Sequence, residues 1–526
     1  MLNIKKIVLL LFGLISLRPF IFQSPAAFAQ SKGPLRIHPD NSRYFTDNSG
    51  KVIYLTGSHT WSNIFDIDQA SQIIPCSFRF DFDDYLNFLA DSNHNFIRGW
   101  TWELSRYSYD GKTMYSCPQP WARTGLSNAL DGFPKFNLYE YDQAYFNRIR
   151  QNVIKARDRG IYVSIMLFEG HGPNTSQSPW KWNGHPFNKD NNTSGINGDS
   201  NMNDAIVEFH TMAASSTILD IQKNYAKKVV DTVNDLDNVL YEIANEDGGG
   251  SAEWQYYFIN FIKDYEKTKP KQHPVGMTFR WPGGTNLDLF NSPADWISPK
   301  ESSSEKYATD PPVAVGSKVI IVDTDHLCGP CGERSWVWKN FTRGNNFIYM
   351  DPYDSTANES VRNAMGATLK LASRINLAGM TPQKSLCGTG YCLVESGKEY
   401  VIYQPNSGTF SVDLRNISGS FFVEWLNPNT GSITIEGQIS GGSNRSFTPP
   451  FAGDAIIYLK STSLPPPTHC QPLGDIDCNS KVNAFDFGSL IKYWDLDTFP
   501  AANLDDIGIV DKEDTLIMLG NYINNR

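Results

Sequence analysis

The sequence predicts a closed (β/α)8 barrel, followed by a small antiparallel β-sandwich and a small helical module. Three observations predict this order. Between about Val52 and Tyr353, eight short apolar runs alternate with amphipathic helical stretches, the pattern of a parallel barrel. From about Thr381, short alternating strands with Gly and Asn turns are typical of an antiparallel sandwich. Residues 473–525 then contain two copies of an acidic loop, each followed by a helical run.

The N-terminal residues 1–29 have the composition of a secretory signal. Lys5 and Lys6 precede an apolar run, which ends at the small-residue site Ala27-Phe28-Ala29. Arg18 interrupts the run and leaves it short for a membrane anchor. We therefore expect a secreted protein, extracellular or attached to the cell surface, whose eight cysteines can oxidise.

The charge balance argues against two classes of partner. A net charge of -10 and a pI near 5.4 oppose binding to nucleic acid or to an anionic membrane surface. No later segment is apolar over the length that membrane insertion requires. Aromatic residues make up 13% of the chain, which is compatible with sugar binding because aromatic rings stack on sugars as well as fill cores.

The barrel is expected to span residues 34–380. Helical spacing is clearest where Tyr145, Ile149 and Val153 fall on one face and Gly160 follows the end of the helix. The eight expected strands lie in the following runs, given in chain order: VIYLTGSHTW, NFIRGWTWE, IYVSIMLFEG, NVLYEIANE, HPVGMTFRW, DWISPK, KVIIVDTDH and NFIYMDPY.

Residues 381–461 are expected to form the sandwich, with strands in EYVIYQP, FSVDLRN, SFFVEWLNPNTGSITIEG and DAIIYLK. A proline-rich linker, residues 462–472, follows, and proline makes it stiff and extended. The module of residues 473–525 comes last.

The acidic loops of the last module have the spacing of calcium-binding loops. A calcium ion needs several oxygen ligands that converge from one tight loop. The second loop has Ile507 in place of a ligand at its fifth position, so we expect weaker binding there. The expected ligands are Asp475, Asp477, Asn479, Lys481 (through its carbonyl), Asn483 and Asp486 in the first loop, and Asn503, Asp505, Asp511 and Asp514 in the second.

This duplicated loop-helix unit resembles a type I dockerin. The resemblance implies bound Ca2+ and a cohesin-bearing scaffold or cell-surface protein as partner. One departure concerns the recognition positions: Ala484-Phe485 and Lys512-Glu513 are not a matched pair. The two equivalent binding modes of dockerins are therefore in doubt for this chain.

Polar residues lie at the ends of several expected barrel strands, where barrels carry their functional groups. Strand four ends at Asn245 and Glu246, and strand seven ends at Asp323, Asp325 and His326. Cleavage of a glycosidic bond needs two carboxyls, one protonated and one ionised, on either side of that bond. Strands four and seven can supply such a pair. The end of strand two adds Arg98, Trp100, Trp102 and Glu103.

The runs NFIRGW and YEIANE, together with the strand-seven acid, resemble the clan A, cellulase-like glycoside hydrolases. This resemblance implies that Glu246 is the general acid/base, that Asn245 holds a sugar hydroxyl and that Arg98 hydrogen-bonds the nucleophile. The opening run PLRIHPDNSRYFTDNSGKVIYLTGSHTW is similar to glycosidase barrels found beside a collagen-binding-type sandwich. The resemblance extends over residues 34–460.

The strand-seven acid departs from clan A, which usually has glutamate there. Asp323 and Asp325 alternate onto one face, and two close carboxylates split their pKa values. The sequence favours Asp323 as nucleophile, positioned by Asp325 or His326, and Asp325 and Glu333 are alternative nucleophiles. These acids can also merely cap the barrel rim or bind a cation.

Further residues are expected to contact substrate. His59 and Trp61 end strand one and can line a sugar subsite, and Glu169 and His171 end strand three. Three tryptophans are candidate stacking platforms, although each can equally pack in the core. They are Trp100, Trp102 and Trp281.

The Cys-Gly-Pro-Cys run after strand seven has the local pattern of a thioredoxin-like redox site. No compact thioredoxin unit surrounds it, so a structural Cys328–Cys331 bridge, or pairing of either cysteine with a distant partner, is favoured. The other spacings suggest three further pairs, although sequence does not determine connectivity. They are Cys387–Cys392, Cys470–Cys478 and Cys76–Cys117.

Together these features predict a secreted, retaining glycoside hydrolase that acts on a polysaccharide or complex glycan, is tethered through the dockerin and uses no cofactor in catalysis. Retention requires the two carboxyls to lie about 5 to 5.5 Å apart, whereas about 6.5 to 9.5 Å favours inversion. Two alternatives remain. One is a non-catalytic carbohydrate-binding barrel, and the other is an adhesion protein whose sandwich binds collagen or another matrix protein.

Overall fold

The computed structural model describes residues 31–463, except 62, 70–79, 110–111, 172–181, 202–207 and 354–355. The predicted signal peptide, the linker beyond residue 463 and the predicted dockerin with its calcium ligands lie outside the described residues. None of the helices within the described ranges has the length and the apolar run that crossing a bilayer requires.

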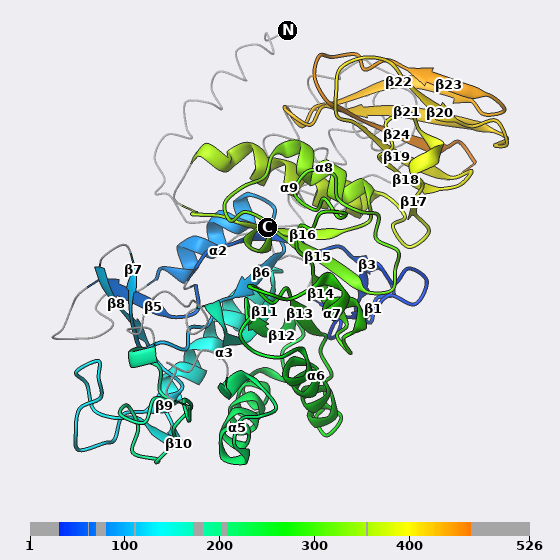
Figure 1. Cartoon of the computed structure of the whole chain (residues 1–526). Helices are drawn as coiled ribbons and strands as arrows, with labels where there is room; N and C mark the ends of the chain where they lie inside the picture. The colour runs from blue at the N-terminus through cyan, green and yellow to red at the C-terminus, as the bar shows by residue number, and fades with distance from the viewer. Residues whose placement is uncertain are drawn as a thin grey trace, which may run out of the picture.

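Eight parallel strands form the central sheet (Figure 1), and each contains part of one predicted apolar run. Neighbours pair in chain order from β6 round to β4. β4 and β6 lie against each other and close the barrel. There the Thr56 N–H donates to Asn95 Oδ1, and the Asn95 N–H donates to the Thr56 carbonyl. The prediction of the barrel is thus confirmed. The strands are β4 (Thr56–His59), β6 (Phe96–Gly99), β11 (Tyr162–Glu169), β12 (Val239–Asn245), β13 (Val275–Thr278), β14 (Trp296–Ser298), β15 (Val319–Asp323) and β16 (Asn346–Met350).

Helices surround this barrel, and side-chain caps set where several of them begin. Asp142 accepts a hydrogen bond from the backbone of Ala144, and Ser251 accepts one from Trp254. The predicted face of α3 is buried at Tyr145, Ile149 and Val153. The helices are α2 (Phe82–Asp91), α3 (Gln143–Arg157), α5 (Ser216–Val233), α6 (Ala252–Glu266), α7 (Asn286–Asn291), α8 (Arg334–Thr342) and α9 (Glu359–Arg374).

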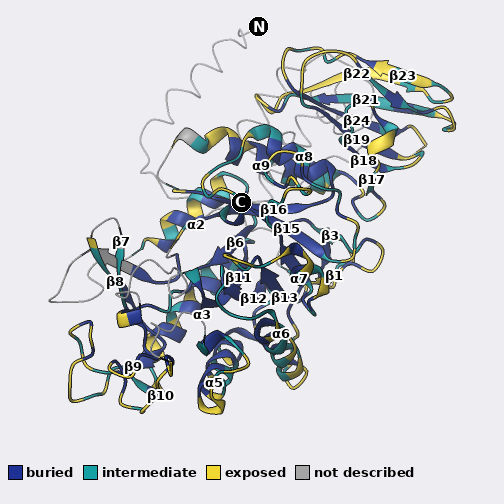
Figure 2. Cartoon of the chain, in the orientation of Figure 1, coloured by how far each residue is buried: buried dark blue, intermediate teal, exposed yellow. Residues whose placement is uncertain are grey.

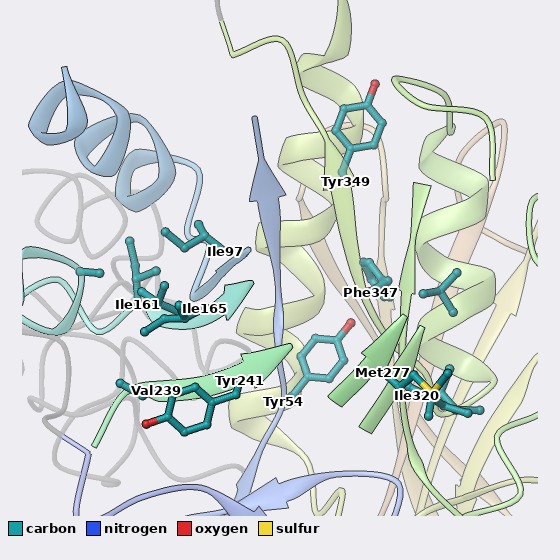
Figure 3. Close-up of a cluster of buried hydrophobic side chains, with 14 of the residues drawn as sticks. Tyr54, Ile97, Ile161, Ile165, Val239, Tyr241, Met277, Ile320, Phe347 and Tyr349 are labelled. Atoms are coloured by element: carbon teal, nitrogen blue, oxygen red, sulfur yellow. The ribbon is translucent and has the colours of Figure 1, made fainter. Parts of the chain in front are cut away.

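The barrel interior and the layer between strands and helices form two separate hydrophobic clusters; the interior one includes Phe96, Leu240 and Ile348. Every residue of β11 and β12 is buried, as expected for a parallel sheet covered on both faces. Figure 2 shows the strands in the buried colour and the outer helix faces exposed. Figure 3 shows Tyr54, Ile165 and Met277 among the packed side chains.

Short elements between β4 and α2 and between β6 and α5 were not predicted. They enlarge the carboxyl-terminal side of the barrel, where β5, β7 and β8 form one antiparallel sheet and β9 pairs with β10. Their bounds are β5 (Asp66–Gln69), β7 (Arg106–Tyr109), β8 (Lys112–Cys117), β9 (Trp121–Ala122), β10 (Asn137–Tyr141), and the 3-10 turns η1 (Trp182–Gly184) and η2 (Glu208–His210). A small N-terminal sheet joins β1 (Arg36–Ile37), β2 (Phe45–Thr46) and β3 (Val52–Ile53). The remaining 3-10 turns are η3 (Thr324–His326), η4 (Thr356–Asn358) and η5 (Lys384–Leu386).

The antiparallel sandwich has its own core, centred on the fully buried Trp425. It lies beside α8 and α9 (Figure 1), where Arg334 pairs with Asp454 and Arg374 pairs with Glu424. Its strands are β17 (Thr381–Pro382), β18 (Cys392–Glu395), β19 (Glu399–Gln404), β20 (Phe410–Asp413), β21 (Ser420–Leu426), β22 (Ile433–Ser440), β23 (Asn444–Phe447) and β24 (Ala455–Ser461).

Disulfides link Cys328 to Cys331 and Cys387 to Cys392, so both predicted pairs are confirmed. Cys117 is also disulfide-bonded. Its predicted partner Cys76 lies outside the described residues, as do Cys470 and Cys478.

Candidate active site

The barrel end that carries the strand C-termini is organised around one buried guanidinium. Arg98, on β6, is 1% exposed and contacts four polar side chains. Its Nε and Nη2 donate to the two oxygens of Glu242, at 2.9 and 2.5 Å. Its Nη2 also donates to Asn245 Oδ1 at 2.8 Å. Arg98 therefore connects strand two to the end of strand four.

Glu242, on β12, was not singled out in the sequence. It is fully buried, and its Oε1 also accepts a hydrogen bond from Thr278 Oγ1 at 3.2 Å. A signal for it existed, because Glu242 lies inside an otherwise apolar strand. A buried carboxylate there requires a charged partner, and Arg98 provides one.

Asp323, the last residue of β15, is enclosed by donors. Its Oδ1 accepts hydrogen bonds from His59 Nε2 at 3.0 Å and from the Asp325 backbone N–H at 2.9 Å. Its Oδ2 accepts one from Arg98 Nη1 at 2.9 Å. Burial raises the pKa of Asp323, but the charges of His59 and Arg98 outweigh burial and hold it below its usual range. Both oxygens of the Asp323 carboxylate thus accept hydrogen bonds, and neighbouring positive charge balances its negative charge.

Asp325 lies two residues further, in η3, and has different surroundings. Its Oδ2 accepts a hydrogen bond from Arg98 Nη1 at 3.1 Å. Burial and the negative charge of Glu246 raise its pKa well above the usual range, and Arg98 only partly opposes them. Asp325 and Glu246 therefore interact across the rim, from the ends of strands seven and four.

Glu246 directly follows β12 in a strained conformation. Its φ of 43° lies in the left-handed region, which non-glycine residues rarely adopt outside functional sites. Its backbone oxygen accepts a hydrogen bond from the Gly248 N–H at 2.9 Å. A Cβ on Gly248 would lie 1.9 Å from the Pro282 oxygen, so glycine is needed where this loop packs.

The Glu246 carboxylate contacts one side chain from strand three. His171 Nδ1 lies 2.8 Å from Glu246 Oε2, and the imidazole stacks on Trp281 with ring centroids 6.0 Å apart. Glu246 is 16% exposed, so ligand and solvent can reach this carboxyl.

A second chain of buried charges lies beneath the Glu246 loop. His210 Nε2 is 3.4 Å from Glu103, and its Nδ1 is 3.1 Å from Asp247. Burial lowers the pKa of His210, but Asp247 and Glu103 outweigh burial and raise it to about 10. His185 contacts Glu103 as well, at 3.2 Å, and burial lowers its pKa. The sequence indicated Glu103 but not His210 or Asp247, because their contact depends on how the long loops fold.

The aromatic residues divide into exposed and buried ones. Trp61 is 48% exposed and Trp281 is 36% exposed. They follow strands one and five, which lie on opposite sides of an eight-stranded barrel. Trp100, by contrast, is buried between Arg98 and the stacked ring of His59. Trp102 is partly buried against Tyr107, with ring centroids 5.0 Å apart.

The remaining predicted residues take supporting positions. His326 is buried, its Nδ1 contacts Ser298 Oγ at 2.9 Å, and burial lowers its pKa to about 4. Glu333 precedes α8 and lines a surface pocket with Arg334 rather than the carboxyl pair. In the described part of the chain, no three or more His, Cys, Asp or Glu side chains gather in a way that could hold a metal ion.

Two family models match parts of the chain. "Domain of unknown function (DUF6298)" matches residues 112–280, and "Putative collagen-binding domain of a collagenase" matches residues 383–458. No curated protein of known function matches the chain.

Solved structures of similar fold are glycoside hydrolases. A putative glycoside hydrolase from Bacteroides vulgatus ATCC 8482 has a TM-score of 0.54 at 12% identity and covers 82% of each chain. A family 5 glycoside hydrolase from the same organism has a TM-score of 0.52 at 12% identity and covers 82% of this chain and 94% of its own. A further glycoside hydrolase has a TM-score of 0.51 at 13% identity and covers 82% and 98%. The chain thus shares the fold of these glycoside hydrolases over most of its length.

Proposed function

We propose that the barrel is a glycoside hydrolase whose two reacting carboxyls are Glu246 and Asp325. The observation that carries this proposal is the interaction of these carboxyls across the rim, which raises the pKa of Asp325. Because the pKa of Asp325 is raised, its carboxyl keeps a proton at a pH where an isolated aspartate is ionised. One proton shared by two carboxyls is the state that glycoside cleavage requires.

The contacts suggest how the two roles divide. For Asp325 to attack, the one proton of the pair must lie on Glu246, and the guanidinium of Arg98 beside Asp325 favours this arrangement because it stabilises the ionised aspartate. Glu246 is the more exposed acid, and His171 beside it can hold the carboxyl in place. Glu246 would protonate the leaving oxygen while Asp325 attacks the anomeric carbon, and Glu246 would then take a proton from the water that releases the sugar.

Asp323, which the sequence favoured as nucleophile, fits a positioning role better. Its carboxylate oxygens already accept hydrogen bonds from His59, from Arg98 and from the backbone of Asp325. An attack by Asp323 would have to break these bonds in a site where it is 1% exposed. We assign it the task of fixing Arg98 and the η3 turn that carries Asp325.

The test is a screen of polysaccharides for newly formed reducing ends, with the mature protein and three variants. Glu246→Gln and Asp325→Asn should each lower kcat by at least about 1000-fold, because each removes a group that acts in the transition state. Glu253→Gln, which removes a carboxylate from the first turn of α6, is the matched control and should retain activity. A wild-type protein that binds a glycan but hydrolyses none would contradict the proposal and favour a non-catalytic barrel.

Retention of anomeric configuration is a further part of the proposal, and it follows from the resemblance to clan A. Proton NMR of the first product formed from an active glycan tests it. The same anomer as in the substrate supports a glycosyl-enzyme on Asp325, and the opposite anomer would make Asp325 a base that activates water.

A second candidate function concerns the sandwich, because a family model described as collagen-binding matches residues 383–458. Collagen binding predicts that the full chain is retained on immobilised collagen and that Glu246→Gln does not change this retention. Loss of all glycan cleavage together with such retention would favour the adhesion function.

Secretion and tethering rest on sequence alone. We propose that residues 1–29 direct export and that residues 473–525 bind Ca2+ and then a cohesin. Binding of the full chain to an immobilised cohesin should be lost in EGTA and return with Ca2+. Asp475→Ala, in the first loop, should weaken it more than Asp505→Ala in the second.

A further inference from the structure

One cation at the barrel rim is held firmly in place. Lys300 follows strand β14, and its backbone N–H donates to Asn286 Oδ1 at 3.0 Å. Asn286 Nδ2 donates in turn to the Lys300 carbonyl at 2.9 Å and to Glu305 Oε2 at 2.7 Å. Because Asn286 bonds both the N–H and the carbonyl of Lys300, the backbone that carries this side chain is fixed.

The ammonium group of Lys300 lies over aromatic rings rather than beside a carboxylate. Its Nζ is 5.4 Å from the ring centroid of Phe279 and 5.5 Å from that of Trp281. Burial lowers the pKa of Lys300, and the negative charge of Glu246 opposes this shift. No carboxylate of the described residues lies within ion-pair distance of this Nζ.

Two other half-buried lysines of the barrel are paired with carboxylates, and a third, Lys318, donates to the backbone carbonyls of Ser292 and Ala294. Lys263 Nζ lies 2.7 Å from Asp295, and Lys271 Nζ lies 2.6 Å from Asp237. A partly desolvated ammonium without such a partner is costly, and aromatic faces compensate for only part of that cost. Lys300 is therefore a cation that a bound anion can complete.

Lys300 is linked to Glu246, the proposed general acid, through contacts with two aromatic side chains. Trp281 contacts both the Lys300 ammonium and the imidazole of His171, and His171 contacts Glu246. The exposed ring of Trp281 can take the apolar face of a sugar. We call Lys300, Trp281 and His171 the strand-six subsite.

We propose that the strand-six subsite binds an anionic sugar, carboxylated or sulfated, next to the bond that is cleaved. Lys300 pairs with the anionic substituent and Trp281 stacks on the ring. The inference rests on the proposed glycoside hydrolase function. The chain has a net charge of -10 and carries Glu246 and Asp325 at the rim, so it repels an anionic glycan. A cation placed where the anionic substituent lies offsets this repulsion.

The experiment compares matched polymers on the full-length chain. One arm uses a uronic-acid polysaccharide and the same polymer after its carboxyls are reduced to alcohols. The other arm uses a sulfated polysaccharide before and after desulfation. Each pair keeps its linkages and differs in charge, so the arm that shows the preference identifies the anion.

Lys300→Gln should lower kcat/KM on the preferred anionic polymer by about 10- to 100-fold, the value of one hydrogen bond to a charged group. It should change kcat/KM on the neutral form by less than about 2-fold. Lys300→Arg keeps the charge and should keep the preference. Lys460→Gln is the control, because Lys460 is a half-buried lysine on β24 of the sandwich whose pKa burial also lowers.

Binding is measured separately, as retardation of the Glu246→Gln variant in gels that contain each polymer. Lys300→Gln in that background should abolish the retardation by the anionic polymer. An equal loss on anionic and neutral polymers would overturn the inference and leave the glycoside hydrolase function intact. Charge-selective binding without hydrolysis by the wild-type protein would support the subsite and overturn the proposed function, and neither binding nor hydrolysis would overturn both.

Discussion

The rim has an inner and an outer layer of charged side chains. The two layers differ in how fully hydrogen bonds and opposite charges compensate each carboxylate. In the inner layer, Arg98, Glu242, Asp323 and His59 are at most 1% exposed, and every carboxylate oxygen accepts a hydrogen bond. In the outer layer, the negative charge of Glu246 acts on Asp325, and Arg98 compensates the charge of Asp325 only in part.

The two aspartates of strand seven show what this difference does. Asp323 and Asp325 are two residues apart, yet their pKa values shift in opposite directions. Sequence spacing places both at the rim, but the donors around each decide its role. A compensated carboxylate stabilises the fold, whereas a carboxyl with a strongly raised pKa at the barrel rim is a candidate for the reaction itself.

The largest expected effect comes from removing the cation of the inner layer. Arg98→Met leaves Glu242 and Asp323 buried without their partner and should lower the free energy of unfolding by about 3–5 kcal/mol, measured by urea denaturation. The control is Arg415→Met in the sandwich, where an exposed pair with Asp413 is lost, and no measurable change is expected. Equal stability of Arg98→Met and wild type would contradict the compensated inner layer.

The buried chain beneath the Glu246 loop gives the next effect. His210→Phe leaves Glu103 and Asp247 without a cation and should cost about 3 kcal/mol near pH 6. Because the folded pKa of His210 is raised to about 10, its contribution is complete below its ordinary pKa and disappears as the pH rises through 10. The difference between wild type and variant should therefore shrink at alkaline pH, and a constant difference would exclude a charged His210.

Asp323→Asn should lower the free energy of unfolding by about 2 kcal/mol at pH 7. The amide of asparagine would present N–H groups to His59 and Arg98, which are donors themselves. The folded pKa of Asp323 is lowered, so its contribution is present above the ordinary aspartate pKa and is lost as the pH falls through the folded value. Unfolding curves of both proteins from pH 7 downward should therefore converge, and a gap that widens in acid would refute this assignment.

Asp325→Asn should raise the free energy of unfolding, by about 1 kcal/mol at pH 8. This is the smallest of the four effects and the only gain in stability. The folded pKa of Asp325 is raised, so the ionised carboxyl destabilises the fold increasingly above the ordinary aspartate pKa. The gain should vanish near pH 4, where thermal unfolding of the two proteins should coincide. A loss of stability at pH 8 would place Asp325 in the compensated layer.

The inner and outer layers also differ in how far sequence could predict them. The eight strands were predictable because a covered parallel sheet needs continuous apolar runs, and the end of each run places Arg98, Glu246 and both aspartates at the rim. Glu242 could have been found as a charge inside such a run. His210 could not, because its contacts depend on long loops whose course no periodicity encodes. Lys300 ends the predicted run DWISPK, but nothing in that run indicates its contact with Trp281.

The choice between the two aspartates was likewise beyond the sequence. Period-two alternation puts Asp323 and Asp325 on one face, but η3 begins at Thr324 and turns Asp325 away from the strand direction. The donors that separate their roles come from strands one and two, far away in the chain. Only the folded barrel brings them together.

Azide rescue tests most directly whether Asp325, rather than Asp323, is the reacting carboxylate. Asp325→Ala and Asp323→Ala are assayed with and without azide on a glycan that the wild-type protein hydrolyses, because a small anion can occupy the space of a missing nucleophile. If Asp325 is the nucleophile, azide restores turnover to Asp325→Ala and yields a glycosyl azide, with no rescue of Asp323→Ala. Rescue of Asp323→Ala alone would contradict it and return the nucleophile to the buried aspartate.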